Sequence, residues 1–411
     1  MFKFILNSIK YIKNNILADS INGVLFIKNH NIVCLIFEHK EDKIVILGYK
    51  KIKSSGIKDG IITDFNLAHQ TFASVINEAE FEAKIRIHKV IIYLETSHSK
   101  HFIYPFSTHV HNTISQEVLQ NLLEIKTIES LLEKNQYVCN ILPINVIIDD
   151  NKVENPIGLY ANKINLDIFV STIDETIILN YKKILDYLDI KIKGFISSPI
   201  LLTNNIESRD TTNEGAIELI LYISKDITTY CYKENNIIKK ISIINIGDKY
   251  ISSYLSKKLN ITEDVIDEIR TDYLSQENIK NNYSNKNIEI EHNGVVKVIK
   301  YKNFYDNYNE VSIDLISQLI SLVNLPKNIN RLEILSDNFD FSDVLNIAKG
   351  VFDIDIKTSY NYKVVIYNNK KIALDDFIIS NFFHYFIYLL KQDIAGSTFE
   401  ARLKNYINTR E

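Results

Sequence analysis

Alternating apolar and polar positions predict that the first part of the chain is rich in β-strands. Three segments within residues 20–50, GVLFIKN, IVCLIFEH and KIVILGYK, alternate with the period of a strand. A helix follows at NLAHQTFASVINEAEFEA, with Asp64 as its expected N-cap, and the apolar segment KVIIYLE predicts the next strand. These elements predict an α/β unit at the start of the chain.

The same kind of pattern returns in the second part of the chain. The segment ELILYISKDITTYCYKENNIIKKISI, residues 218–243, predicts three short strands joined by tight polar turns. Before it, VCNILPINVIIDD, VENPIGLYANKINLDIFVST and IKIKGFISSPILL are mostly β, with a helix at DETIILNYKKILDYL between the last two. A polar run at 204–215 separates the two parts, so we expect two strand-rich α/β halves joined at a hinge.

Residues 1–18 predict an amphipathic helix. Lys3 and Lys10 lie at the border of its apolar face, which consists of Phe2, Ile5, Leu6, Ile9, Ile12, Ile16 and Leu17. No acidic residue occurs before Asp19, a pattern typical of a helix that lies in a membrane surface with its lysines facing anionic lipid. Its length and its lysines argue against a transmembrane span. The alternative is a terminal helix that packs on its own domain.

The C-terminal part, residues 376–411, predicts a helix and a tail. FIISNFFHYFIYLL, residues 377–390, is too short to span a bilayer and predicts a buried helix. The tail STFEARLKNYINTRE has charges of both signs around one apolar helical face, formed by Phe399, Leu403, Tyr406 and Ile407. A solvated tail is favoured over a second surface helix.

Composition narrows the classes of function. The 411 residues are 46% hydrophobic, enough for two domains or one large segmented one. With 47 basic and 51 acidic residues the net charge is −4, so no basic excess points to nucleic acid. Cys34, Cys139 and Cys231 stand singly in apolar runs, which indicates buried, reduced thiols in a cytosol.

Glycine is the most informative residue type. The chain has 11 glycines, and the closest pair is Gly56 and Gly60. Loops that cradle phosphates need glycine where the backbone takes positive φ and its N–H groups approach phosphate oxygens. A P-loop and a dinucleotide-binding fingerprint are both absent from the sequence.

Four histidines lie close together in the sequence. They are His98, His101, His109 and His111, spaced as HxxH and HxH. An HxH pair on a strand puts both imidazoles on one face, as zinc ligation requires. No cysteine or cluster of acids completes the set nearby. We therefore expect polar residues at strand ends and no metal site.

Residues 137–172 resemble a stretch of the bacterial cell-division protein FtsA. The block matches the family at Pro143, Asp149, Asn155, Pro156, Gly158 and Leu159. Asn-Pro starts a turn there, and Gly158 permits the backbone to reverse. Two further blocks match in the family's order, SSGIKDGIITDF at Gly56, Gly60 and Asp64, and IINIGDKYISSYLSKKLNIT at Gly247, with Ser252-Ser253 in place of Thr-Asp. The pilus-assembly protein PilM has a similar layout.

The resemblance implies an α/β, actin-like fold of duplicated ribonuclease H-like domains with the small α+β insertion subdomain of FtsA. The helix 1–18 and the C-terminal part 376–411 would flank it. The expected subdomains are the first actin-like subdomain at 20–86 and 172–205, the insertion at 87–171, the second core at 214–250 and 305–375, and the distal subdomain at 251–304.

The resemblance also locates where an actin-type ATPase would hold its nucleotide. Such a protein has two glycine-bearing hairpins, each with an acid near Mg²⁺, and a later Gly-Gly turn under the adenosine. The first acid falls on Phe26, the next Gly-Thr on Lys28-Asn29, and the adenosine turn on Leu335-Ser336-Asp337. None of these positions keeps the chemistry of the family.

The second hairpin falls on residues 221–226 and fails in the same way. Leu221 stands at the acid position and cannot ligate magnesium, which demands oxygen ligands. Ile223 and Lys225 replace the glycines and bring β-carbons into the space of the phosphate oxygens. We therefore expect no cofactor and no ATP hydrolysis, although ATP is what the resemblance alone would imply.

The function implied is that of a divergent adaptor, not an enzyme, which tethers the tubulin-like protein FtsZ to the inner membrane as a peripheral protein on its cytoplasmic face. Its partners would be FtsZ and the lipid surface, with self-association and other division proteins as further candidates. The family usually carries its membrane helix at the C-terminus, whereas here the stronger amphipathic helix is N-terminal. In the family the FtsZ surface lies on the distal subdomain, here about 251–304.

Two alternatives stay open. One is an actin-like ATP-binding filament protein or ATPase with a remodelled site. The other is a PilM-type platform for pilus assembly.

Overall fold

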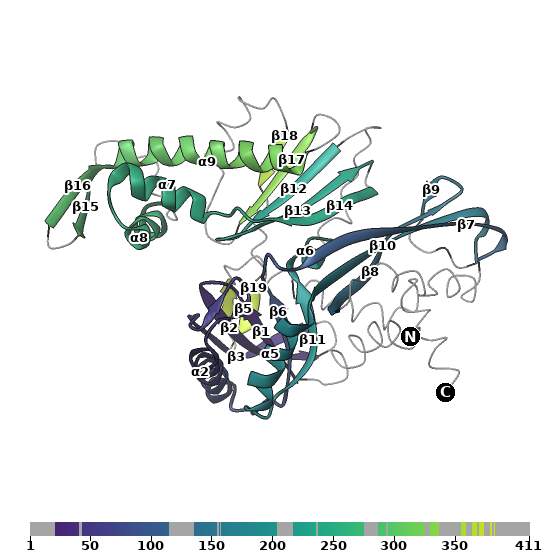
Figure 1. Ribbon diagram of the computed structural model, residues 1–411, viewed down its shortest axis with the longest axis horizontal. Coiled ribbons are helices and arrows are strands. Elements are labelled where there is room, and N and C mark those ends of the chain that lie inside the picture. The colour runs from purple at the N-terminus through teal and green to yellow at the C-terminus, as the bar shows by residue number, and fades with distance from the viewer. Residues whose placement is uncertain are drawn as a thin grey trace.

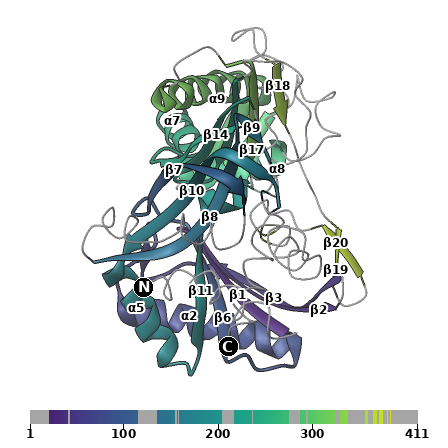
Figure 2. The ribbon, with the colours of Figure 1, turned by 90° about the vertical axis from the view of Figure 1, so that its right-hand side faces the viewer.

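The computed structural model shows two α/β halves and a third, smaller sheet beside them (Figures 1 and 2). It describes residues 21–40, 43–114, 135–153, 156, 158–203, 217–235, 237–274, 287–292, 295–324, 329–336, 355–358, 364–367, 370–373, 379 and 382. The predicted helix at 1–18, with its proposed membrane-binding residues, lies outside these ranges, as does most of 376–411. No helix in the described part of the chain is long and apolar enough to cross a membrane.

The first half contains a seven-stranded sheet, here called the first sheet, with the order β11-β6-β1-β2-β3-β19-β20. Strands β1, β2 and β3 pair antiparallel, and β6 and β11 run parallel to β1. Those five strands are β1 (Ile21–Ile27), β2 (Asn31–Lys40), β3 (Lys43–Lys53), β6 (Lys89–Leu94) and β11 (Lys191–Ser197). The predicted strands at the start of the chain are confirmed.

Two helices cover one face of the first sheet, α2 (Phe65–Ala83) and α5 (Glu175–Asp186). Asp64 caps α2, because its carboxylate accepts a hydrogen bond from the backbone N–H of Leu67 at 3.0 Å, as predicted. The small hairpin β4 (Ile57–Lys58) and β5 (Ile61–Ile62) precedes this helix.

The second half repeats the strand order of the first. Its sheet, here called the second sheet, has the order β14-β13-β12-β17-β18, again with three antiparallel strands followed by two parallel ones. Its strands are β12 (Ile217–Ile223), β13 (Thr228–Glu234), β14 (Ile237–Ile244), β17 (Arg331–Ser336) and β18 (Asp355–Thr358). The three strands predicted at 218–243 are confirmed, and the duplicated order is the one expected of an actin-like fold.

A helical distal part follows β14 and returns to the second sheet. It consists of α7 (Lys249–Leu259), α8 (Glu263–Leu274), the hairpin β15 (Asn287–His292) and β16 (Val295–Lys300), and α9 (Tyr301–Val323). α9 runs along the second half (Figure 1) and buries an apolar face that includes Val311, Leu315 and Leu319.

The third sheet occupies the place of the expected insertion, with the order β7-β10-β8-β9. Its strands are β7 (Lys100–Thr113), β8 (Gln136–Ile148), β9 (Asn151–Lys152) and β10 (Tyr160–Asp174). Gly158 precedes β10 with a φ of +87°, as a reversal after the Asn-Pro turn requires. The short helix α6 (Ser198–Thr203) then leads out of β11.

Two strand positions differ from the expected subdomain limits. β6 was placed at the start of the insertion, but it is a central strand of the first sheet. β19 (Val364–Tyr367) and β20 (Lys370–Ala373) were placed in the second core, but β19 pairs with β3 of the first sheet. Both strands pair with partners far away in the chain, β6 with β1 and β19 with β3, so local alternation does not reveal which sheet they join.

A shared apolar core joins the two halves. It contains Phe26 from β1, Phe169 from β10 and Tyr222 from β12, so all three sheets contribute to one cluster. Ile379 and Phe382 are helical and buried in it, at the start of the helix expected at 377–390. Because protein interiors are close-packed, this shared core restrains how the halves sit against each other.

Candidate functional site

Two hairpin turns from the two halves meet at the place where the resemblance puts the phosphates of a nucleotide. We call this place the hairpin junction: residues 28–30 between β1 and β2, residues 224–227 between β12 and β13, and Glu95 after β6. His30 Nε2 lies 2.9 Å from Asp226 Oδ2, so the turns touch directly. The protein's own side chains make this contact without a ligand between them.

Asp226 is held charged by its neighbours across the junction. Burial alone would raise its pKa, but hydrogen bonds from His30 and Asn29 and the charge of His30 outweigh burial and hold the pKa below its ordinary value. Asn29 in turn accepts from the backbone N–H of Asp59, in the β4–β5 turn. One carboxylate of the second half is therefore bound by the first half at the junction.

A second contact joins the halves at the base of the same turn. The hydroxyl of Ser224 donates to Glu95 Oε1 at 3.0 Å, and Glu95 is 5% exposed at the end of β6. Ser224 takes the place of a family residue whose backbone would face phosphate. The side chain of Glu95 thus occupies the base of this turn.

Lys225 of the second turn is turned toward the distal part. Its Nζ pairs with Asp267 of α8, and Asp267 Oδ1 also accepts from Ser252 Oγ at 2.6 Å. Behind them Arg270, fully buried, donates to Asp248 Oδ2 at 3.3 Å and to Ser252 Oγ at 2.6 Å. The positive charge of Lys225 is thus paired with a carboxylate of the protein itself, as part of a network of polar side chains.

Gly247, which resembles a glycine of the family, brings the next loop against the second turn. A β-carbon at this position would lie 2.5 Å from the carbonyl oxygen of Ser224 and 2.6 Å from that of Lys225. Its close approach lets Asp248 N and Lys249 N donate to these two carbonyls, both at 2.8 Å. Two backbone carbonyl oxygens of the turn are therefore hydrogen-bonded to the loop at 247–249.

The strand register corrects one of the predicted positions. Phe26 pairs with Val33 just before the first turn, and Tyr222 pairs with Thr229 just before the second, so Tyr222 is the equivalent of Phe26. Leu221 and Ile223 point to the opposite face, into the core under α9. A shift of one residue along a strand reverses the side-chain direction, which is why the transfer of the acid position to Leu221 was wrong.

Aromatic rings fill the acid positions. Phe26 is fully buried, with ring centroids 5.6 Å from Tyr93 and 5.4 Å from Phe382. Lys28 and Ser336 are each mostly buried at the ends of β1 and β17. Asp337 lies outside the described residues. No carboxylate stands at the described positions where the resemblance to the family would put one.

Strand β8 carries two asparagines that hold the edges of both main sheets. Asn140 donates to Phe195 O at 3.0 Å and accepts from Ser197 N at 2.9 Å, so it binds the edge strand β11. Asn145 donates to Ile238 O at 2.9 Å and accepts from Ile238 N at 3.3 Å, so it binds the edge strand β14. We call β8 with these two side chains the asparagine strap. Sequence reasoning missed it, although two asparagines within an apolar strand were a visible signal.

The four histidines of the predicted weak metal motif are not brought together. His98 pairs with Asp59, and His101 is bonded to Ser99 and stacked on Phe169, where burial lowers the pKa of His101 to about 3. His109 stacks on His111. Within the described ranges there is no group of three or more histidines, cysteines or acids that could hold a metal.

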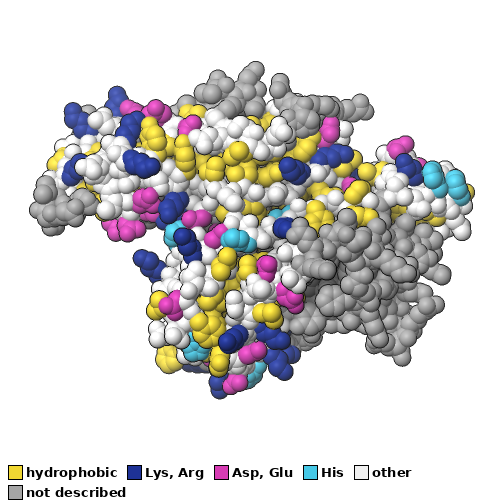
Figure 3. Space-filling model, in the orientation of Figure 1, with side chains coloured by type: hydrophobic (Ala, Val, Ile, Leu, Met, Phe, Trp, Pro, Cys, Tyr) yellow, Lys and Arg dark blue, Asp and Glu magenta, His cyan; other side chains and the backbone are white. Residues whose placement is uncertain are grey.

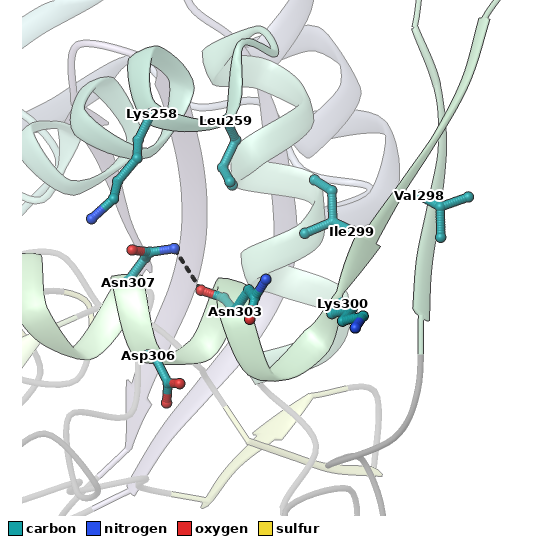
Figure 4. A pocket seen from close by; sticks show the side chains of 8 residues that line it. All are labelled: Lys258, Leu259, Val298, Ile299, Lys300, Asn303, Asp306 and Asn307. Carbon is teal, nitrogen blue, oxygen red and sulfur yellow. Dashed lines mark hydrogen bonds between the residues drawn. The ribbon is translucent and has the colours of Figure 1, made fainter.

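The distal part contains a pocket of about 700 Å³ (Figure 4). It lies between the end of α7, the strand β16 and the start of α9, and it combines an apolar side with two lysines. It is lined by Lys258, Leu259, Val298, Ile299, Lys300, Asn303, Asp306 and Asn307. Val298 is 54% exposed there, so an apolar side chain is presented to solvent.

Comparison with known proteins relates the chain to cell-division proteins. It is 22% identical over 255 residues to the cell division protein FtsA of Streptococcus pneumoniae, covering 61% of this chain and 55% of that protein. It is 24% identical over 256 residues to the FtsA of Neisseria meningitidis, covering 61% of each. The chain spans about half the length of the curated relatives it matches. No family model matches it.

Among solved structures, the chain is similar to one described as a PilM-PilN type IV pilus biogenesis complex. The TM-score is 0.57 at 10% identity, covering 90% of this chain and 98% of that one, which shows the fold alone. Together the comparisons show a divergent FtsA-like protein with an actin-like fold.

The asparagine strap gives a first prediction. We expect Asn140→Ala and Asn145→Ala each to lower the free energy of unfolding by about 1–3 kcal/mol, because each change leaves buried backbone groups of an edge strand without partners. Hydrogen exchange should rise at β11 for the first variant and at β14 for the second. The matched control Asn165→Ala, on the neighbouring strand β10, removes only an exposed bond to Ser107 and should change stability by less than about 0.5 kcal/mol. Equal effects of all three would contradict the strap.

The junction gives a second prediction, on pH. Because the folded pKa of Asp226 is lowered from 3.8, its contribution is present above that pH and is lost as the pH falls below it. We expect Asp226→Asn to cost about 1 kcal/mol at pH 7 and progressively less below pH 4, measured by denaturant unfolding. Asp186→Asn, on the exposed end of α5, serves as the control. A cost for Asp226→Asn that did not shrink in acid would show that the charge is not what binds the turns.

Proposed function

We propose that this divergent FtsA-like protein is an adaptor that holds FtsZ at the cytoplasmic face of the bacterial inner membrane without hydrolysing ATP. The observation that carries the proposal is the hairpin junction, where His30 and Asp226 pair across the place of the phosphates. A protein whose two halves are joined by its own side chains needs no nucleotide to hold them together. Such a protein works through its surfaces.

The distal pocket is the proposed FtsZ surface. It lies in the distal part, where the resemblance to FtsA puts the binding surface for FtsZ. Leu259 and Val298 offer apolar contacts, and Lys258 and Lys300 offer positive charge. Hydrogen bonds to Glu310 and Tyr254 raise the pKa of Lys258, so it stays charged. These features suit a peptide that carries both apolar and acidic side chains.

The membrane contact is assigned to the amphipathic segment 1–18. Its lysines and apolar face suit an anionic lipid surface. Self-association and contacts with other division proteins are compatible with this role and are not needed for it. The main competing function is an actin-like ATP-binding protein with a remodelled site.

The absence of nucleotide binding is the prediction that separates these functions. We expect no measurable binding of Mg-ATP by isothermal titration calorimetry, because the aromatic rings of Phe26 and Tyr222 stand where acids would hold the magnesium. Binding with a micromolar dissociation constant would contradict this and favour the ATP-binding alternative. FtsZ binding measured on the same preparation serves as the positive control for folded protein.

The adaptor role is tested by co-sedimentation of FtsZ with lipid vesicles in the presence of the chain. We expect FtsZ to sediment with the full chain and not with a chain lacking residues 1–17, while deletion of 397–411 has little effect. If neither deletion releases the protein from lipid, the tether assignment is wrong. If FtsZ never sediments, the adaptor proposal falls.

The role of the distal pocket is tested by comparing substitutions of two exposed valines on strand β16. Val298→Asp places a charge in the pocket and should weaken FtsZ binding by about tenfold or more, because it removes apolar contact and repels acidic side chains. Val296→Asp, two residues away on the same strand and 62% exposed, lies outside the pocket lining and should have little effect. Equal affinities of the two variants, measured by fluorescence anisotropy, would place the FtsZ surface elsewhere.

A further inference from the structure

A basic rim surrounds the point at which β1 begins. Residues 84–89 run from the end of α2 to β6, and their side chains alternate between the body and the solvent. Ile87 points inward and is 6% exposed, while Lys84, Arg86 and His88 are exposed. Lys84, Arg86 and His88 are therefore three exposed basic side chains within one short segment.

The first sheet adds further cations at the same end. β1, β6 and β11 are parallel and begin side by side, and Lys191 of β11 pairs in register with Lys89 of β6, both exposed. Acids also lie at this end: Asp186 is the last residue of α5, Asp189 lies in the turn before β11, and Glu38 pairs with Ile21 at the start of β1. We call Lys84, Arg86, Lys89 and Lys191 the basic rim. Lysine and arginine side chains gather along the lower edge of the first half in Figure 3.

Two glutamates at the end of α2, close to the rim, accept hydrogen bonds from the backbone. Glu80 Oε1 accepts from the backbone N–H of Ile87 at 2.7 Å, and Glu82 Oε2 accepts from that of Tyr49 at 2.9 Å. Each of these carboxylates thus has a backbone partner, although the side chain of Glu82 is exposed.

An aromatic side chain stands beside the rim. Phe81 is 86% exposed on the last turn of α2, three residues before Lys84. It lies opposite the buried face of the helix, which is formed by Ala68, Phe72, Val75, Ile76 and Ala79. An exposed aromatic ring near basic side chains is a combination that interfacial membrane contacts use, and here Lys84 follows Phe81 by three residues, with Glu80 and Glu82 on either side of it.

Chain length links this end of the protein to the amphipathic segment. β1 begins at Ile21, four residues after Leu17, and Gly23 packs directly against Ile87 and Val90. Four residues span at most about 14 Å. A lipid surface that holds residues 1–17 is therefore kept close to the rim, and charges within about one Debye length of it, about 8 Å, feel its potential.

We propose that the basic rim and Phe81 form a second membrane contact, in which the folded first half rests on an anionic lipid surface beside the amphipathic segment. The inference rests on the proposed membrane role of residues 1–18 and adds the lipid class and the face of the body that meets it. Residues 1–18 supply attachment, and the rim sets the orientation of the body.

The experiment compares two variants of the full chain with the same net charge. The rim variant carries Lys84→Asn, Arg86→Gln and Lys191→Gln, with asparagine at 84 because that residue has a φ of 54°. The control variant carries Lys239→Gln, Lys257→Gln and Lys302→Gln, three exposed lysines of the second half. Sedimentation is measured with vesicles of phosphatidylcholine alone and with vesicles containing about one third phosphatidylglycerol.

We expect the parent to bind anionic vesicles more tightly than neutral ones, and the rim variant to lose about tenfold or more of its binding to anionic vesicles alone. The control variant should bind as the parent does. Phe81→Ser should weaken binding to both kinds of vesicle, since it removes apolar contact and no charge. Circular dichroism confirms that each variant is folded.

Two failures can be told apart. If the parent binds vesicles and the rim and control variants bind alike, the rim is not a lipid contact, and a different occupant such as an acidic protein is indicated. If the parent binds neither kind of vesicle, the membrane part of the proposed function falls and the rim proposal falls with it.

Discussion

The charge of Asp226 is the constraint on which the junction of the two halves depends. A carboxylate that is largely removed from water must be paired, and Asp226 is paired by His30 and Asn29, which belong to the other half. Glu95 meets Ser224 in the same way a few residues away. In an actin-like protein with nucleotide, phosphate and metal would supply such pairing between the two turns. Here the chain supplies it, so the turns close on each other.

Two further features hold the halves together. The two sheets share an apolar core, and the asparagine strap ties β11 of the first sheet and β14 of the second to one strand of the third sheet. Side-chain amides are well suited to this, because each can donate to and accept from the backbone of an edge strand at once. Backbone groups at the edges of two sheets are thereby satisfied.

The sequence predicted the local elements well and the long-range arrangement less well. Strict alternation identified β1, β2, β3 and the three strands at 218–243, because burial on one face imposes that period. It failed for β19, whose sheet is set by a partner far away in the chain. It also shifted the acid position of the second hairpin to Leu221, since only the register of the pairing shows that Tyr222 is the equivalent of Phe26.

For the candidate site, too, the sequence showed which residue types are present but not which residues are in contact. The scarcity of glycine and the apolar residues at the expected acid positions were visible in the sequence. The contacts between the parts of the chain were not visible, because His30 and Asp226, or Asn145 and Ile238, are far apart in the chain and meet only when the sheets are assembled. A lone histidine in a turn carries no signal of its partner.

The restrained arrangement of the two halves bears on the proposed adaptor role. The distal pocket and the basic rim lie at opposite ends of the molecule, the first beside α7 and α9 and the second at the start of β6 and β11 (Figure 1). If the halves rotated freely, the distance between these ends would vary with every opening. The junction, the shared core and the strap each resist that rotation with separate contacts, so loss of one leaves the others in place. In the proposed adaptor role, a body restrained in this way would hold a bound partner at a constant height above the surface on which it rests.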